Sequence, residues 1–260
     1  MFAGCDLGTV SVKVVITNGP EIVATEILPY KNLPQLAVKE AMDNALKKAD
    51  LTSEDIDFCA ATGFGKKAVP FADKESPEVV CLNRAFRRLY PEVRTIVDIG
   101  GQSMRAINLN DRGKVLDSTA NEKCASGTGK FIEVMGRALE MSLDQMSQLP
   151  VEAAEPLPIT SQCGVFAESE VITYVNDGKE SADIAAGIAL SVANKISSLT
   201  RRITLTEKLA LVGGVALNAG VVKYINSELK MEPIALGQDP RLFAALGAAI
   251  IAEEQFAAKS

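Results

Sequence analysis

The chain of 260 residues contains no histidine. This absence excludes a Ser-His-Asp triad and every histidine-ligated zinc site, because only cysteines and carboxylates remain as ligands for a transition metal. No apolar run reaches the ~18 residues of a membrane span, and the longest extends from Leu242 to Ala252. We therefore expect a soluble, cytoplasmic protein that has no membrane partner.

Positive charge is also scarce, because 27 Lys and Arg stand against 33 Asp and Glu and leave a net charge of −6. Such a chain lacks a global positive field that could hold a phosphate backbone, so we expect no nucleic-acid partner. The five cysteines form no C-x-x-C pair, and no signal peptide precedes them. A secreted disulfide scaffold is therefore improbable, which leaves reduced thiols or metal thiolates.

The N-terminal segment predicts a β-meander, since apolar runs alternate there with turn residues. The expected strands are Phe2–Asp6, Val12–Thr17 and Ile22–Leu28. A helix is expected from about Leu33 to Ala49, with Leu36 on its apolar side, and a strand that runs into Thr62-Gly63 follows it.

The same pattern restarts at Thr95, which indicates a diverged tandem duplication. The alignment pairs Asp98 with Asp6, Gly100 with Gly8 and Arg105 with Lys13. It also pairs the late strand Leu209–Val212, with the glycines that follow it, with the strand before Thr62-Gly63. We expect two similar α/β domains, residues 1–94 with a final helix at about 242–260, and residues 95–241. Helices are also expected at Gly129–Leu139 and Ile184–Arg201, within some 90 extra residues of the second copy.

Each copy places a carboxylate at a glycine turn after its first strand, in Asp6-Leu7-Gly8-Thr9 and in Asp98-Ile99-Gly100-Gly101-Gln102. Glycine lets backbone N–H groups approach an anion, and the carboxylate can hold Mg²⁺ through water. The amide of Gln102 can orient an attacking water. A single D-x-G motif is more often a plain hairpin turn, but its recurrence in one repeat frame favours two phosphate-binding loops.

Together with Gly213-Gly214, these loops resemble the actin, Hsp70 and sugar-kinase superfamily of ATPases. The resemblance implies an α/β fold of two ribonuclease-H-like domains with an interdomain nucleotide cleft. It implies Asp6, Asp98 and Gln102 as catalytic residues. The residues implied to bind ATP or ADP and Mg²⁺ are Gly8, Thr9, Val10, Ser11, Val12, Lys13, Gly100 and Gly101 at the phosphates, and Gly213, Gly214 and Asn218 beside the adenosine.

The cysteine segments are more specific: Cys124 stands in N-E-K-C-A-S-G-T-G-K-F and Cys163 in T-S-Q-C-G-V-F-A-E-S-E. They closely resemble the ATPase family that activates 2-hydroxyacyl-CoA dehydratases and drives benzoyl-CoA reductases. In that family each subunit of a homodimer gives two cysteines to one shared 4Fe-4S cluster, so the resemblance implies these two residues as ligands. A helix beginning just after Cys124 would aim its positive end at the cluster. Ordinary buried thiols are expected at Cys5, Cys59 and Cys81.

The resemblance further implies ATP-driven transfer of single electrons from reduced ferredoxin or flavodoxin to an iron–sulfur partner. That partner is a 2-hydroxyacyl-CoA dehydratase, a benzoyl-CoA-type reductase or a double-cubane cluster protein, and the sequence does not choose among them.

The alternative is a small-molecule kinase of the same fold without a cluster, because Asp98 can serve as a base. A scaffold or filament-forming protein would explain neither the cysteine segments nor Gln102. Three features depart from relatives: Leu217 and Arg241 near the expected adenine site, and Ser103-Met104-Arg105 in place of a common D-x-K.

Overall fold

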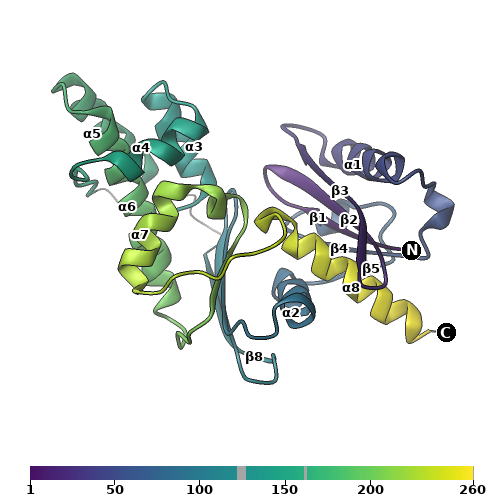
Figure 1. Cartoon of the computed structure of the whole chain (residues 1–260). Coiled ribbons are helices and arrows are strands. Elements are labelled where there is room, and N and C mark those ends of the chain that lie inside the picture. The colour runs from purple at the N-terminus through teal and green to yellow at the C-terminus, as the bar shows by residue number, and fades with distance from the viewer. Residues whose placement is uncertain (122–126, 161–162, 260) are drawn as a thin grey trace. The chain divides into compact units, whose positions relative to one another are not determined.

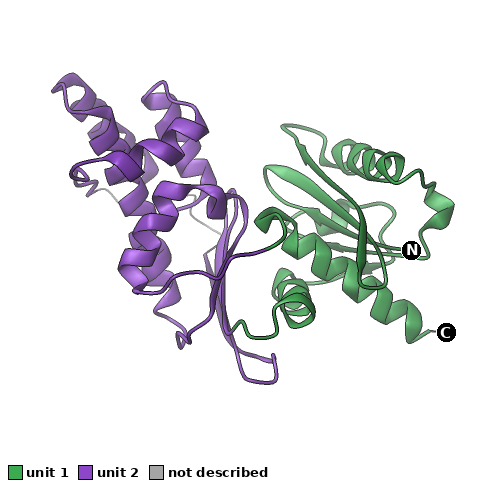
Figure 2. Ribbon diagram, in the orientation of Figure 1, with its two compact units in different colours: residues 1–93, 237–260 green, residues 94–236 purple. Residues whose placement is uncertain are grey.

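A computed structural model describes residues 1–121, 127–160 and 163–259 (Figure 1). The chain divides into two compact units, unit 1 with residues 1–93 and 237–260, and unit 2 with residues 94–236 (Figure 2). The return to unit 1 comes at residue 237, a few residues before the sequence-based boundary at about 242. There the N–H of Gly237 donates a hydrogen bond of 2.5 Å to the hydroxyl of Tyr90, which ties the returning chain to unit 1.

A five-stranded sheet in the order β3-β2-β1-β4-β5 forms the centre of unit 1. The first strands make the expected antiparallel meander, and β4 runs parallel to β1. The bounds are Phe2–Leu7 for β1, Ser11–Asn18 for β2, Glu21–Pro29 for β3, Phe58–Thr62 for β4 and Lys74–Glu75 for β5.

Helix α1 (Pro34–Lys48) covers one face of this sheet. Proline at the first helical position is favourable, because its missing N–H would have no partner there. The buried stripe recurs every three to four residues at Ala37, Val38, Ala41, Met42, Ala45 and Leu46. Leu36, which the sequence placed on the apolar side, is instead exposed because the stripe begins one residue later.

Helix α8 (Phe243–Ala257) lies on the opposite face of the sheet and packs against α2 (Glu78–Leu89), as Figure 1 shows. Two glycines permit this. A Cβ at Gly4 of β1 would lie 1.9 Å from the carbonyl oxygen of Ala245, and a Cβ at Gly247 would lie 1.8 Å from that of Cys81. The C-terminal helix is therefore part of the core of unit 1.

Unit 2 repeats the arrangement in a four-stranded sheet with the order β8-β7-β6-β9. Strands β6, β7 and β8 form an antiparallel meander, and β9 runs parallel to β6 as β4 does to β1. The bounds are Thr95–Ile99 for β6, Met104–Leu109 for β7, Val115–Asn121 for β8 and Leu209–Val212 for β9. This topology confirms the predicted duplication.

The helices of unit 2 are α3 (Gly129–Ala138), α4 (Leu143–Glu152), α5 (Gly164–Asn176), α6 (Ser181–Thr200) and α7 (Ala219–Leu229). Helices α3 and α6 were expected from the sequence, whereas α4, α5 and α7 were not. In Figure 1, α3, α4 and α5 gather at one end of unit 2. No helix in the described part of the chain has the length and hydrophobicity of a membrane span.

We expect Gly247→Ala and Gly4→Ala each to lower the free energy of unfolding by about 2 kcal/mol or more, because the added methyl group meets backbone atoms that cannot rotate away. Chemical denaturation measures this change. Gly214→Ala is the control, since a Cβ at that position has no neighbour within 4 Å. Unfolding of Gly247→Ala at the parental denaturant concentration would contradict the packing described for α8.

Candidate functional site

The loop between β1 and β2 is built around an ion pair. Asp6 is the penultimate residue of β1 and lies directly opposite Lys13 of β2, and Lys13 Nζ is 3.1 Å from Asp6 Oδ2. The N–H of Gly8 donates to the carbonyl of Ser11 at 3.2 Å and closes the turn. Thr9 and Val10 form its outer side, whereas the side chain of Val12 is fully buried. Of the expected phosphate-binding residues, Val12 thus offers a ligand only its backbone.

Tyr30 supports this loop and was not identified from the sequence. Its hydroxyl donates a hydrogen bond of 2.6 Å to the carbonyl of Gly8, and its backbone N–H donates to the carbonyl of Val10 at 3.1 Å. Burial raises the pKa of Tyr30, with a further rise from Asp6 that Lys13 opposes. The hydroxyl therefore stays protonated, and able to donate, at neutral pH.

The segment after β4 lies directly against the carboxylate of Asp6. Gly63 has φ of +89°, and a Cβ there would lie 2.3 Å from Asp6 Oδ1 and 2.6 Å from the carbonyl oxygen of Leu7. The N–H of Gly65 donates to that same carbonyl at 2.9 Å. Only glycine allows this approach, because a side chain would both clash and strain the backbone.

Unit 2 repeats these contacts. Asp98 lies opposite Arg105, with Oδ2 3.6 Å from the guanidinium, and the N–H of Gly100 donates to the carbonyl of Ser103 at 2.8 Å. Gly213 has φ of +86°, and a Cβ there would lie 2.8 Å from Asp98 Oδ1. The predicted pairing of Asp98 with Asp6 and of Arg105 with Lys13 thus extends to individual hydrogen bonds and to the glycine beside each carboxylate. Gln102 is exposed in this loop.

The loop that carries Gln102 is bonded to the first turn of α3. The N–H of Gly129 donates to the carbonyl of Gly100 at 3.0 Å, and that of Lys130 donates to the carbonyl of Gly101 at 2.8 Å. These first N–H groups of α3 are therefore bonded to the loop of Gln102, and the expectation that the helix directs its positive end at a metal centre stays a prediction. Cys124 lies outside the described residues.

The glycines after β9 begin an open stretch of surface. Gly214 has no atom within 4 Å of its ideal Cβ position, and the nearby side chain of Leu217 is exposed. Asn218 is buried: its Oδ1 accepts from the N–H of Val221 at 2.9 Å as the N-cap of α7, and its Nδ2 donates to the carbonyl of Met146 at 3.3 Å. Both ends of this amide therefore serve the fold of unit 2.

The described cysteines fall into two kinds. Cys5, Cys59 and Cys81 are buried, whereas Cys163 is exposed at the N-cap of α5. Burial raises the pKa of Cys59 and of Cys81 to about 12 and raises that of Cys5 as well, so these three thiols stay protonated and unreactive. Within residues 1–121, 127–160 and 163–259, no three cysteines or carboxylates come together as a metal site.

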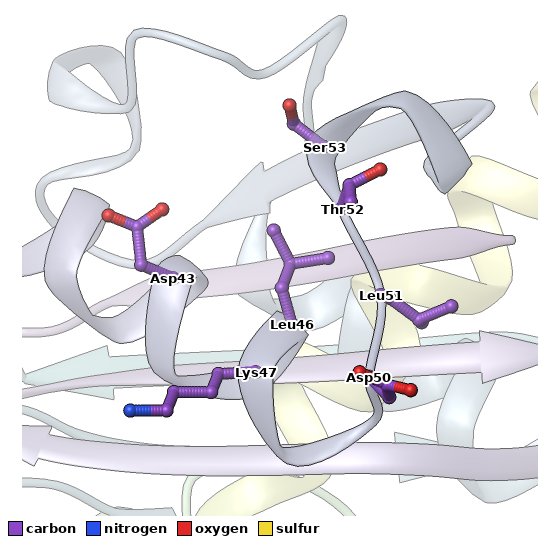
Figure 3. A pocket seen from close by; sticks show the side chains of 7 residues that line it. All are labelled: Asp43, Leu46, Lys47, Asp50, Leu51, Thr52 and Ser53. Atoms are coloured by element: carbon purple, nitrogen blue, oxygen red, sulfur yellow. The ribbon is translucent and has the colours of Figure 1, made fainter.

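A hollow of about 360 Å³ lies at the C-terminal end of α1 and in the loop that follows it (Figure 3). Its lining residues are Asp43, Leu46, Lys47, Asp50, Leu51, Thr52 and Ser53. None of the sequence-predicted site residues is among them, so this hollow is separate from the candidate residues described above.

Comparison with known proteins gives a consistent result. The profile of the BadF/BadG/BcrA/BcrD ATPase family matches residues 3–252. An activator of lactoyl-CoA dehydratase from Anaerotignum propionicum is 41% identical over 252 residues, 96% of each chain. The activating ATPase of (R)-2-hydroxyglutaryl-CoA dehydratase from Acidaminococcus fermentans is 34% identical over 263 residues, which cover 98% of this chain and 97% of the relative. The predicted resemblance is confirmed.

Solved structures agree. The activator of the 2-hydroxyisocaproyl-CoA dehydratase from Clostridium difficile, with bound ADPNP, superposes with a TM-score of 0.94 at 36% identity and covers 100% of this chain and 97% of that one. A ROK hexokinase from Thermus thermophilus shares the fold alone, with a TM-score of 0.50 and 14% identity over 98% of this chain and 99% of that one. The expected fold class, that of the actin, Hsp70 and sugar-kinase superfamily, is confirmed.

We expect Tyr30→Phe to loosen the first glycine loop while leaving the sheet intact, because it removes only the hydroxyl that bonds Gly8. Loss of one such hydrogen bond, at about 1 kcal/mol, predicts about fivefold faster amide hydrogen exchange at Gly8. Tyr224→Phe, on α7 of unit 2, is the matched control. Unchanged exchange at Gly8 in the Tyr30 variant would show that the loop holds its shape without this contact.

Proposed function

The chain belongs to the BadF/BadG/BcrA/BcrD ATPase family, and we propose that it is a homodimeric ATPase that delivers single electrons to an iron–sulfur partner enzyme. One observation carries this proposal: the loop with Gln102 is bonded through Gly100 and Gly101 to the first turn of α3. Helix α3 follows Cys124 in the sequence, so the contact connects a phosphate-binding loop with a segment that binds the cluster.

The nucleotide chemistry follows from the two glycine loops. Asp6 and Asp98 are acidic groups at strand ends, and carboxylate oxygens are the ligands that Mg²⁺ prefers. Lys13 and Arg105 hold the two carboxylates in place. We propose that each loop binds phosphate and Mg²⁺ of ATP through the backbone N–H groups of Thr9 to Ser11 in one loop and of Gly101 in the other, while Gly8 and Gly100 close the two turns. The exposed amide of Gln102 orients the attacking water.

The remaining expected residues have separate parts in this proposal. Gly213 and Gly214 give the adenosine an open glycine surface, on which Leu217 offers an apolar contact. Asn218 maintains that surface through its cap on α7. Arg241 forms a bidentate ion pair with Asp239 and lowers the pKa of that carboxyl. The guanidinium of Arg241 is therefore already bonded within unit 1.

The cluster proposal rests on Cys163 and Cys124. A 4Fe-4S cluster supplies a low-potential one-electron centre when bound, and it needs four thiolates. The thiol of Cys163 fits this role because it is exposed at the start of a helix, unlike the three buried cysteines. One chain contributes a pair of ligands, so a two-fold dimer supplies the full set.

The surface of α5 supports such a dimer. This helix buries only Ala167 and Val171, although it is one of the more apolar helices of the chain. Val165 is 70% exposed and Phe166 is 67% exposed, immediately after Cys163. Apolar side chains in this position favour contact with a second copy that also brings its own cysteines.

Coupling follows from the contact between the loop and α3. Binding and hydrolysis of ATP change the contacts that the phosphates make with the loop of Gln102. The hydrogen bonds from the N–H groups of Gly129 and Lys130 to the carbonyls of that loop transmit this change to α3. The partner is a 2-hydroxyacyl-CoA dehydratase, a benzoyl-CoA-type reductase or a double-cubane cluster protein. Reduced ferredoxin or flavodoxin in the cytoplasm supplies the electron.

A small-molecule kinase of the same fold remains the alternative, since the glycine loops alone serve phosphoryl transfer equally well. Anaerobic purification separates the two functions. A brown protein with about four irons per dimer supports the electron donor, whereas a colourless protein that phosphorylates a hydroxyl compound supports the kinase.

We expect Gln102→Ala to lower kcat for ATP hydrolysis by about 100-fold with little change in KM, because the amide acts mainly by positioning water in the transition state. Asp6→Asn should weaken Mg²⁺-dependent binding of ATP as well as turnover, since it removes a charge that faces the metal. Gln35→Ala, an exposed amide on α1, is the control. Steady-state kinetics measure these changes. A parental rate of ATP hydrolysis in Gln102→Ala would show that Gln102 has no part in the mechanism.

We expect Cys163→Ser and Cys124→Ser each to lose iron and colour and to loosen the dimer, because a shared cluster links the two subunits. Cys59→Ser is the matched control, since its thiol is buried in unit 1. Iron analysis and sedimentation under anaerobic conditions measure both effects. A monomer with a full iron complement would overturn the shared ligation.

A further inference from the structure

The chain that leads to Cys163 is bonded along the side of α5. The carboxylate of Glu170 accepts two hydrogen bonds from Thr160, one from its N–H at 2.9 Å and one from its hydroxyl at 2.5 Å. One helical turn further, the hydroxyl of Tyr174 donates to the carbonyl of Pro158 at 2.8 Å. Glu170 and Tyr174 are four residues apart, so they lie on one face of the helix and hold two points of the same segment.

The segment is also fixed further upstream, at the start of α6. Asp183 Oδ1 accepts from the N–H groups of Ala154 at 3.1 Å and Glu155 at 3.2 Å. The N–H of Leu157 donates to the backbone carbonyl of Asp183 at 3.1 Å. A Cβ at Gly187 of α6 would lie only 2.0 Å from the carbonyl oxygen of Leu157. The path from residue 154 to residue 160 is thus bonded first to α6 and then to α5.

Cys163 itself is fixed on its C-terminal side by the helix, because its carbonyl accepts the N–H of Ala167 at 2.9 Å. On its N-terminal side, the nearest described residue is Thr160, three residues earlier, which is bonded to Glu170. The sequence contains both partners within one motif, since Glu170 is the last residue of V-F-A-E-S-E. The hydrogen bonds give that glutamate a physical role that a sequence pattern alone does not reveal.

We propose that Glu170 and Tyr174 are positioning residues that set the place of the Cys163 thiol through Thr160 and Pro158. The inference rests on the proposed function, in which Cys163 is a cluster ligand. A ligand from an exposed loop must reach one fixed position, and a loop held at both ends reaches it with less reorganisation. A carboxylate suits this task, because hydrogen bonds to a charged acceptor are shorter and stronger than neutral ones.

The test compares Glu170→Ala, Glu170→Gln and Tyr174→Phe in the full-length dimer under anaerobic conditions, with Glu168→Ala on the same helix as the matched control. Amide hydrogen exchange at Thr160 should rise about tenfold in Glu170→Ala and less in Glu170→Gln, which keeps one acceptor oxygen. Iron release to a chelator should accelerate in the same order, and the midpoint potential of the cluster should shift. Tyr174→Phe should raise exchange and iron release in the same sense.

Thr160→Val isolates the route of the effect, because it removes the hydroxyl that donates to Glu170. If Glu170 acts through Thr160, the double variant with Glu170→Ala should release iron no faster than Glu170→Ala alone. Additive effects would overturn that route. Faster exchange at Thr160 with parental iron release and potential would overturn the positioning role while leaving the cluster assignment intact. If the parental protein, purified under anaerobic conditions, contains no iron, the proposed function and this inference are both overturned.

Discussion

In each unit, the carboxylate near the end of the first strand lies against the loop after the neighbouring parallel strand, and this approach requires a glycine with positive φ in that loop. Gly63 meets this condition beside Asp6, and Gly213 meets it beside Asp98. The opposite side of each carboxylate faces a cation from the next strand, so the acidic group is held between a bare backbone and an ion pair. The two glycine loops keep their shapes through this constraint, and each unit satisfies it independently.

The duplicated scaffold has been modified in one copy only. Between β8 and β9, the described part of unit 2 contains four helices, α3 to α6, where unit 1 has the helix α1 between β3 and β4, and the two cysteine segments belong to this insertion. The insertion is bonded to the glycine loop of its unit, because the first N–H groups of α3 donate to the carbonyls of Gly100 and Gly101.

The strands and the repeat were predictable because turn residues separate the apolar runs of β1 to β3 and because Asp98 to Arg105 repeats the spacing of Asp6 to Lys13. Helices α4 and α5 were not, and each has a physical reason. Helix α4 contains Pro150 in its interior, which argues against a helix in any pattern of propensities. Helix α5 has apolar residues on all sides and no single apolar stripe of helical period, so its sequence does not indicate a helix that packs by one face.

The sequence by itself determined the absence of histidine chemistry, the repeat frame, the glycine loops and the identity of the cysteine segments, because these depend on residue type and spacing alone. Only the tertiary structure decided which groups meet across long separations: Tyr30 on Gly8, α3 on the loop of Gln102, and Glu170 on Thr160. The physical reason is that a hydrogen bond between distant segments requires a direction and a distance of about 3 Å. No local pattern encodes these, since they arise from how the helices and strands of each unit pack.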